Sequence, residues 1–229
     1  MNNIYLSERF SRNFAKNLQE ITESSLEKAD EFLHLNRQNF DIYIAPDDVE
    51  DGGEITVFPE TYASGLVNIR VIKNYNPDEL TGELFHELSH VKWAETHDED
   101  DGYELFNFAI NEGVAELIKF EIAKKTCVNL PKYVGIHQLL SRREILNGLR
   151  EIITITEKNL PWDKNDWFWN FAKNAKYPSN FGYHIGMFIV REFSRKYDLE
   201  PTKLTNISYE KFYIFAKNLV KNSLKSEKK

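Results

Sequence analysis

The sequence predicts an α+β protein, most of it helical, in a single domain that spans residues 1–229. Apolar residues recur at helical spacing near the N-terminus, three short segments then have strand character, and the remainder has helical patterning interrupted by prolines. Helices, a small sheet and further helices, with no internal repeat and no Gly/Ser-rich linker, are typical of this class. We expect N-terminal helices over 1–40, a small sheet over 41–73, two helices over 77–125 and C-terminal helices over 137–222.

The first forty residues have the apolar spacing of amphipathic helices. Phe10, Phe14 and Leu18 follow one another at intervals of four, which places them on one helical face and predicts one or two helices. The segment after them alternates between apolar and polar residues and stops at Pro46, as a strand does. Together with a later segment rich in β-branched residues, the strand candidates are 40–45, 55–58 and 65–72.

The long C-terminal part begins with a clear helix start. Pro77 followed by Asp78 and Glu79 makes a favourable first turn, because proline fits that position and acidic side chains suit a helix N-terminus. Prolines farther along mark the connections between elements. We expect helices at 77–95, 102–125, 137–157, 165–175, 180–197 and 208–222.

Charge and composition exclude several classes of protein. The 29 Lys+Arg and 36 Asp+Glu give a net charge of −7, and the basic residues cluster only in the tail after Lys221, so we expect no nucleic-acid partner. The lone Cys127 favours a reducing compartment. The most apolar window, 181–190, is too short to span a bilayer, and no signal peptide is visible. These features predict a cytoplasmic protein with no membrane partner.

Residues 86–90 carry the strongest chemical signal. They are His86-Glu87-Leu88-Ser89-His90, the H-E-x-x-H pattern, in which residues i and i+4 share one face of a helix and can point both imidazoles at one ion. Glu87 lies about 100° around such a helix, beside the ion, where it can take a proton from a metal-activated water. A chance pentapeptide on an amphipathic helix is the alternative.

Two acidic residues farther along the chain can complete the site. Glu112 and Glu116 are again four apart on a predicted helix, and catalytic zinc takes three protein ligands. If this helix crosses behind the first, Glu112 can be the third ligand, while Glu116 can accept the outer N–H of a ligand histidine. Small neighbours, Gly113 and Ala115, would permit a close approach of these two helices. Two exposed glutamates on a solvated face are the alternative.

These motifs resemble those of known metallopeptidases. His86-Glu87-x-x-His90 followed by Asn111-Glu112-Gly113 is similar to the gluzincins, the clan of thermolysin and the zinc aminopeptidases. Phe181-Gly-Tyr-His-Ile-Gly186 is similar to a Gly-Tyr-x-x-Gly segment in a bacterial family known as predicted zinc-dependent proteases, which also has Glu-Gly-x-Ala-Glu. The matches cover roughly residues 77–190.

The resemblance implies a fold and a set of roles. The fold is a thermolysin-like zincin core with a small, mostly antiparallel sheet, an HExxH helix, a glutamate helix and a helical C-terminal half. Strand 65–72 is the candidate edge strand for an extended substrate. For the site, the resemblance implies Zn²⁺ held by His86, His90 and Glu112, a general base at Glu87, an acid behind the ligands at Glu116, and an oxyanion donor at Tyr183 or His184.

We therefore expect a zinc metallopeptidase, a hydrolase that cleaves peptide bonds in peptides or unfolded proteins. Two alternatives remain open at this point. One is a zinc-binding regulatory or scaffold domain with little or no turnover, and the other is a non-haem iron centre, which also uses two histidines and a carboxylate. The sequence leaves open the substrate, endo- or exopeptidase mode, the oligomeric state and whether the N-terminal helices cover the cleft.

Overall fold

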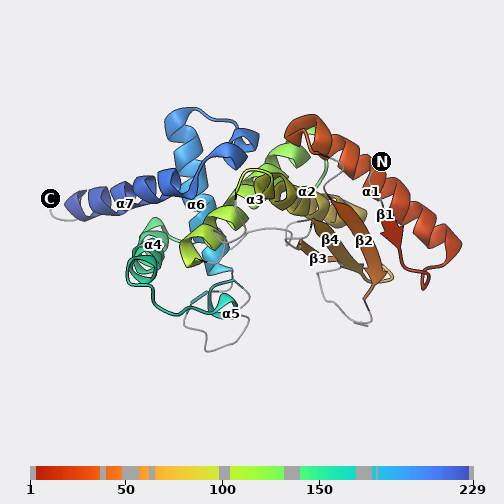
Figure 1. Ribbon diagram of the computed structural model, residues 1–229, viewed down its shortest axis with the longest axis horizontal. Helices are drawn as coiled ribbons and strands as arrows, with labels where there is room; N and C mark the ends of the chain where they lie inside the picture. The colour runs from red at the N-terminus through yellow and green to blue at the C-terminus, as the bar shows by residue number, and fades with distance from the viewer. Residues whose placement is uncertain are drawn as a thin grey trace. The chain divides into compact units, whose positions relative to one another are not determined.

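The computed structural model describes residues 4–36, 40–47, 57–61, 65–97, 104–131, 140–168, 177–178 and 180–226. These residues form an α+β protein, mostly helical, with one small mixed sheet (Figure 1). No helix among them is both long and apolar enough to cross a membrane. The first two residues of the expected strand 55–58, and the part of the expected helix 165–175 after residue 168, lie outside the described residues.

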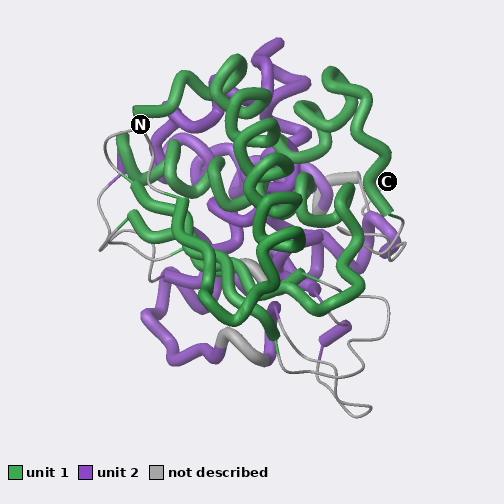
Figure 2. Tube along the Cα trace, turned by 90° about the vertical axis from the view of Figure 1, so that its right-hand side faces the viewer, with its two compact units in different colours: residues 1–96, 118–137 green, residues 97–117, 138–229 purple. Residues whose placement is uncertain are grey.

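The chain divides into two compact units. One contains residues 1–96 and 118–137, and the other contains residues 97–117 and 138–229 (Figure 2). The helix α3, Leu105–Lys125, contributes its first part to the second unit and its last part to the first.

The first unit contains the sheet, whose strand order is β1-β2-β4-β3. β1 pairs with β2 and β2 with β4 in parallel, and only β3 with β4 is antiparallel. The expectation of a mostly antiparallel sheet is therefore wrong. Its strands are β1 (Ile4–Leu6), β2 (Asp41–Pro46), β3 (Val57–Thr61) and β4 (Leu66–Val71).

The helix α1, Arg12–Leu33, explains the parallel pairing of β1 and β2. Parallel neighbours need a crossover of a dozen or more residues, and this 22-residue helix supplies it. Strand β1 is too short to show alternation in the sequence, which is why it was not expected. β4 lies between β2 and β3, so the prediction that strand 65–72 forms an edge is also wrong. The edge of the described sheet on that side is β3.

Helices α1 and α2 lie on one side of the sheet (Figure 1). The side chains that alternate inward from β2 and β4 are fully buried, whereas Tyr43 and Arg70, which alternate outward, are exposed. The helix α2, Pro77–Ala94, is the expected helix 77–95. The Asn76 side chain caps it by accepting the N–H groups of Asp78 and Glu79. The buried inward-facing strand residues are Ile42, Ile44, Val67, Ile69 and Val71.

The second unit is helical. α4, α6 and α7 pack against one another, and the capping box between Ser141 and Glu144 starts α4 at Arg142. Residues 137–139 of the expected helix 137–157 lie outside the described residues. Apart from α3, its elements are α4 (Arg142–Glu157), α5 (Lys164–Trp167), α6 (Phe181–Tyr197), the 3₁₀ helix η2 (Pro201–Asn206) and α7 (Tyr209–Ser226).

A glycine contact brings α3 and α6 together inside this unit. A Cβ added to Gly186 would lie 1.7 Å from the carbonyl oxygen of Ala109, and one added to Gly113 would lie 2.3 Å from the carbonyl carbon of Gly186. Backbone therefore touches backbone at this crossing. Gly113 allows α3 to contact α6 closely, whereas the sequence argument had paired it with the helix of the two histidines.

We predict that Gly186→Ala destabilises the protein by about 3 kcal/mol or more, because the new methyl group meets main-chain atoms that cannot move aside. Gly182→Ala is the matched control on the same helix. Its methyl group would meet the edge of the Phe168 ring at 2.3 Å, and a ring can rotate away. Urea unfolding of both variants tests this, and a larger loss for Gly182→Ala would contradict it.

Candidate metal centre

His86 and His90 lie one turn apart on α2 and face each other. Their Nε2 atoms are 3.0 Å apart, and their rings are nearly perpendicular with centroids 4.7 Å apart. His86 is buried and His90 is partly exposed. The i, i+4 spacing stacks both imidazoles on one face of the helix, as the sequence predicts. Two nitrogen donors thus converge on one point.

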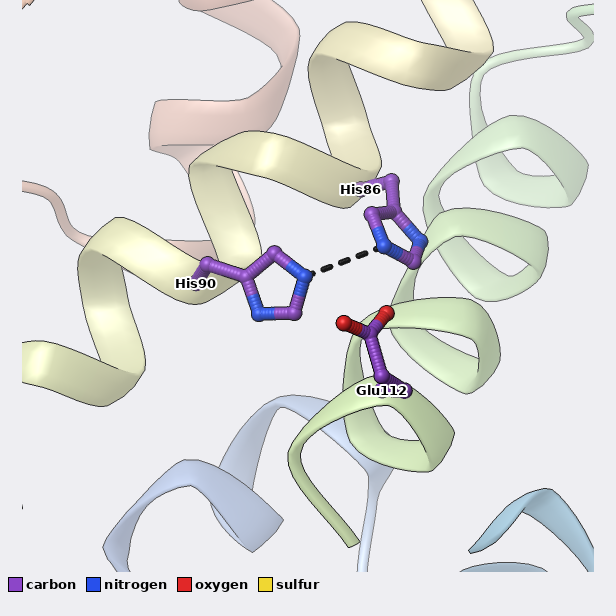
Figure 3. Close-up of side chains that lie close together, drawn as sticks. All are labelled: His86, His90 and Glu112. Carbon is purple, nitrogen blue, oxygen red and sulfur yellow. Dashed lines mark hydrogen bonds between the residues drawn. The ribbon is translucent and has the colours of Figure 1, made fainter. Parts of the chain in front are cut away.

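Glu112, on α3, brings an oxygen donor to the same place. The carboxylate points toward the two imidazoles (Figure 3), and one potential ligand atom from each of the three residues lies within 4.8 Å of the others. Among the described residues, this is the one group of three or more His, Cys, Asp or Glu side chains arranged to hold a metal ion. The set of two imidazoles and one carboxylate is a common ligand set of catalytic zinc.

An ion pair fixes α3 against α2 two turns from this cluster. Lys119 is 1% exposed, and its Nζ lies 3.4 Å from Oε1 of Glu83 on α2. Lys119 lies seven residues after Glu112 on α3, which is about two helical turns, so the two side chains share a face of that helix. The ion pair therefore ties the last part of α3 to the helix that carries both histidines.

Glu87 follows His86 on α2 and is 5% exposed. Its Oε2 accepts a hydrogen bond of 2.5 Å from Oγ1 of Thr61, at the end of β3, and the same hydroxyl lies 3.4 Å from the Glu87 carbonyl oxygen. The sequence argument did not single out Thr61. The expected strand 55–58 ends three residues before Thr61, and no local pattern indicates which helix residue the hydroxyl meets.

Glu116 and His184 lie close together in the second unit, on α3 and α6. Both are buried. Desolvation lowers the pKa of His184 to about 4, and the negative charge of Glu116 acts in the opposite direction. The imidazole is therefore neutral at pH 7. The expected role of Glu116 toward a ligand histidine stays a prediction.

Tyr183 precedes His184 in the first turn of α6. It is half-buried, and its ring packs edge-on against Phe168 with centroids 5.2 Å apart. This contact is ordinary aromatic packing. The expected role of Tyr183 as a hydrogen-bond donor in the reaction also stays a prediction.

Comparison with protein families assigns the chain. Residues 18–213 match the model of a family described as predicted Zn-dependent protease, DUF2268. The chain belongs to this family. No curated protein and no solved structure matches it.

The donor set of this DUF2268 protein agrees with the zinc named in the family description. Zinc is borderline-soft and accepts imidazole nitrogen and carboxylate oxygen, and three protein ligands leave a coordination position open for water or substrate. The Nε2 atoms of His86 and His90 lie close together, and each imidazole can bind a metal only in its neutral form. The three side chains thus fit the metal that the family name implies.

We predict that this protein binds one zinc ion per chain and that His90→Ala or Glu112→Gln weakens binding by more than about 100-fold. Loss of groups that merely support a ligand already costs 10- to 100-fold, so loss of a ligand should cost more. Metal analysis after dialysis, with chelator competition for the affinity, measures this. His34→Ala, at an exposed position, is the control. Full zinc binding by both site variants would contradict the assignment.

We predict that the neutral, buried His184 makes the metal-free protein less stable as pH falls from about 6.5 to about 4. Its folded-state pKa lies below the unfolded value, so the unfolded chain binds a proton in this range that the native state does not. Urea unfolding at several pH values should show a steeper loss for the wild type than for His184→Gln. His34→Gln should follow the wild type, and parallel curves for the wild type and His184→Gln would contradict the prediction.

Proposed function

We propose that this protein is a gluzincin-type zinc metallopeptidase that hydrolyses peptide bonds in peptides or unfolded proteins. One observation carries the proposal: the residues that could hold the metal, His86, His90 and Glu112, converge, and Glu87 follows the first of them on the same helix. The family description, which names a protease and zinc, supports the same reaction class.

The roles of the side chains follow from their chemistry. His86, His90 and Glu112 would hold the zinc ion. A bound zinc ion polarises a carbonyl group and lowers the pKa of water to about 7. Glu87 would accept the proton of the attacking water as the amide carbon is attacked, and would then pass it to the nitrogen of the departing amine. The proton thus moves from water to the leaving group through one carboxylate.

The developing negative charge on the carbonyl oxygen needs a hydrogen-bond donor. Tyr183 and His184 are the candidates, because α6 packs against α3 at the Gly113–Gly186 contact and His184 lies near Glu116. A neutral imidazole has one N–H to donate, and a tyrosine hydroxyl has one O–H. We assign the donor role to this pair of neighbours, and Glu116 to the support of a ligand imidazole.

The thermolysin-like core is part of this proposal. A sheet, then the helix with both histidines, then the helix with the glutamate is the order that the gluzincin resemblance implies, and the described chain has that order. The sheet differs in having two parallel pairings. The edge of the described sheet beside α2 is β3, so we assign to β3 the substrate-facing place first expected for strand 65–72.

The cellular setting is also proposed here. A lone cysteine, Cys127, that is exposed and outside the ligand set suits a reducing compartment such as the cytoplasm. We propose that the protein acts there on peptide or protein substrates, without nucleic acid.

We predict that Glu87→Gln lowers kcat by about 10²- to 10⁴-fold, the usual contribution of a general base, while zinc content stays at one per chain. Cleavage of an internally quenched peptide library and of labelled casein measures the activity. Glu23→Gln, an exposed change on α1, is the control and should be fully active.

Three outcomes would overturn parts of the proposal. Unchanged activity in Glu87→Gln would exclude the mechanism. Zinc binding by the wild type without cleavage of any substrate would favour the scaffold alternative. Iron instead of zinc in anaerobically purified protein would favour the oxygenase-type centre, which uses the same ligand types.

A further inference from the structure

The contact between Thr61 and Glu87 joins the sheet to the helix that carries the histidines. Thr61 ends β3, and its hydroxyl donates a hydrogen bond to one carboxylate oxygen of Glu87 over 2.5 Å. Thr61 is half-buried, and Glu87 is buried. Hydrogen bonds to ionised groups are shorter and stronger than neutral ones. This short contact therefore restrains a side chain that otherwise has three rotatable bonds.

A second carboxylate of α2 holds the other end of the same strand. The backbone N–H of Val57 donates to Oε1 of Glu79 over 3.1 Å, and Glu79 is buried. Thr61 lies four residues after Val57, and Glu87 lies eight after Glu79. Four strand residues span about 13 Å and eight helical residues about 12 Å. The strand and the helix thus run side by side in matching register, fastened at both ends.

Thr61 is also placed independently of Glu87. The antiparallel ladder pairs Thr61 with Val67 and Val57 with Val71, so β4 fixes the backbone of both residues. β4 is in turn paired with β2 along its full length. The hydroxyl of Thr61 is therefore a donor in a position set by the sheet. Its proton is available to Glu87 once the sheet has formed.

We propose that Thr61 is a positioning residue for the general base: its hydroxyl holds Oε2 of Glu87 and so selects the orientation in which the carboxylate takes the proton from water. The terminal torsion of a glutamate is broad, and a hydrogen bond to one oxygen selects one orientation of the carboxylate. Such orientation contributes strongly to the catalytic rate, since a small misplacement of a reacting group can lower the rate by about 100-fold. The inference rests on the proposed function, because it requires Glu87 to act as the base.

Thr61→Val removes the hydroxyl and keeps the shape and the β-branched side chain that a strand accepts. We expect kcat on the quenched peptides to fall by about 10- to 100-fold, with zinc content, KM and unfolding midpoint close to the wild type. Thr61→Ser restores the donor and should recover most of kcat. Thr154→Val, a similarly half-buried threonine whose hydroxyl bonds the Arg150 carbonyl on α4, is the matched control and should leave kcat unchanged.

A readout that is independent of activity accompanies the kinetics. In crystal structures, the Glu87 carboxylate should keep one orientation in the wild type and in Thr61→Ser, and should turn or become multiple in Thr61→Val. If Thr61→Val folds poorly, Thr61→Ala takes its place in both measurements. A threonine that only fastens β3 to α2 would change the unfolding midpoint and not kcat at temperatures where every variant is folded.

The outcomes separate this inference from the proposed function. An active wild type with an equally active, folded Thr61→Val variant, or with an unmoved Glu87 carboxylate, overturns the role of Thr61 and leaves the peptidase assignment intact. A zinc-loaded wild type that cleaves no peptide and no casein overturns the peptidase assignment, and the role of Thr61 with it. A selective loss of kcat, restored by serine, supports both.

Discussion

The buried ion pair between Lys119 and Glu83 is the contact on which the metal centre depends. A lysine that is 1% exposed is costly to bury unless it is paired, so the two helices have one favourable register in which Glu83 meets it. His86 and His90 lie on α2 and Glu112 on α3, so the ion pair joins the two helices from which all three candidate ligands come. A rigid metal site requires ligands on well-packed elements.

The sheet plays a comparable role for Glu87. Two carboxylates on α2 hold the two ends of β3, and one of these carboxylates belongs to the proposed base. The hydrogen bond from Thr61 thus joins the edge strand of the described sheet to the residue that follows His86 on α2. On α6, burial rather than pairing decides the state of His184, which is neutral at pH 7.

Local patterns predicted what depends on local geometry. Helix spacing alone stacks His86 above His90, and Pro77 with the acidic residues after it marks where α2 begins. Thr61 could not be found in this way, because its partner lies 26 residues away in the sequence and no repeat connects them. The parallel pairing of β1 with β2 depends on how α1 returns the chain. Lys119 was not foreseen as a buried residue either, since lysine is usually exposed and its ion pair with Glu83 joins two different helices.

The candidate ligand set of two imidazoles and one carboxylate contains no sulfur, which determines the conditions under which such a site would lose a metal. Thiolate centres lose their metal when peroxide oxidises the ligands, whereas the imidazole and carboxylate groups are not on that oxidation ladder. Protons are the competitor instead, because each histidine must be neutral to bind. A centre of this kind tolerates oxidative stress and responds to acidity, and the exposed Cys127 can be oxidised without removing any of its ligands.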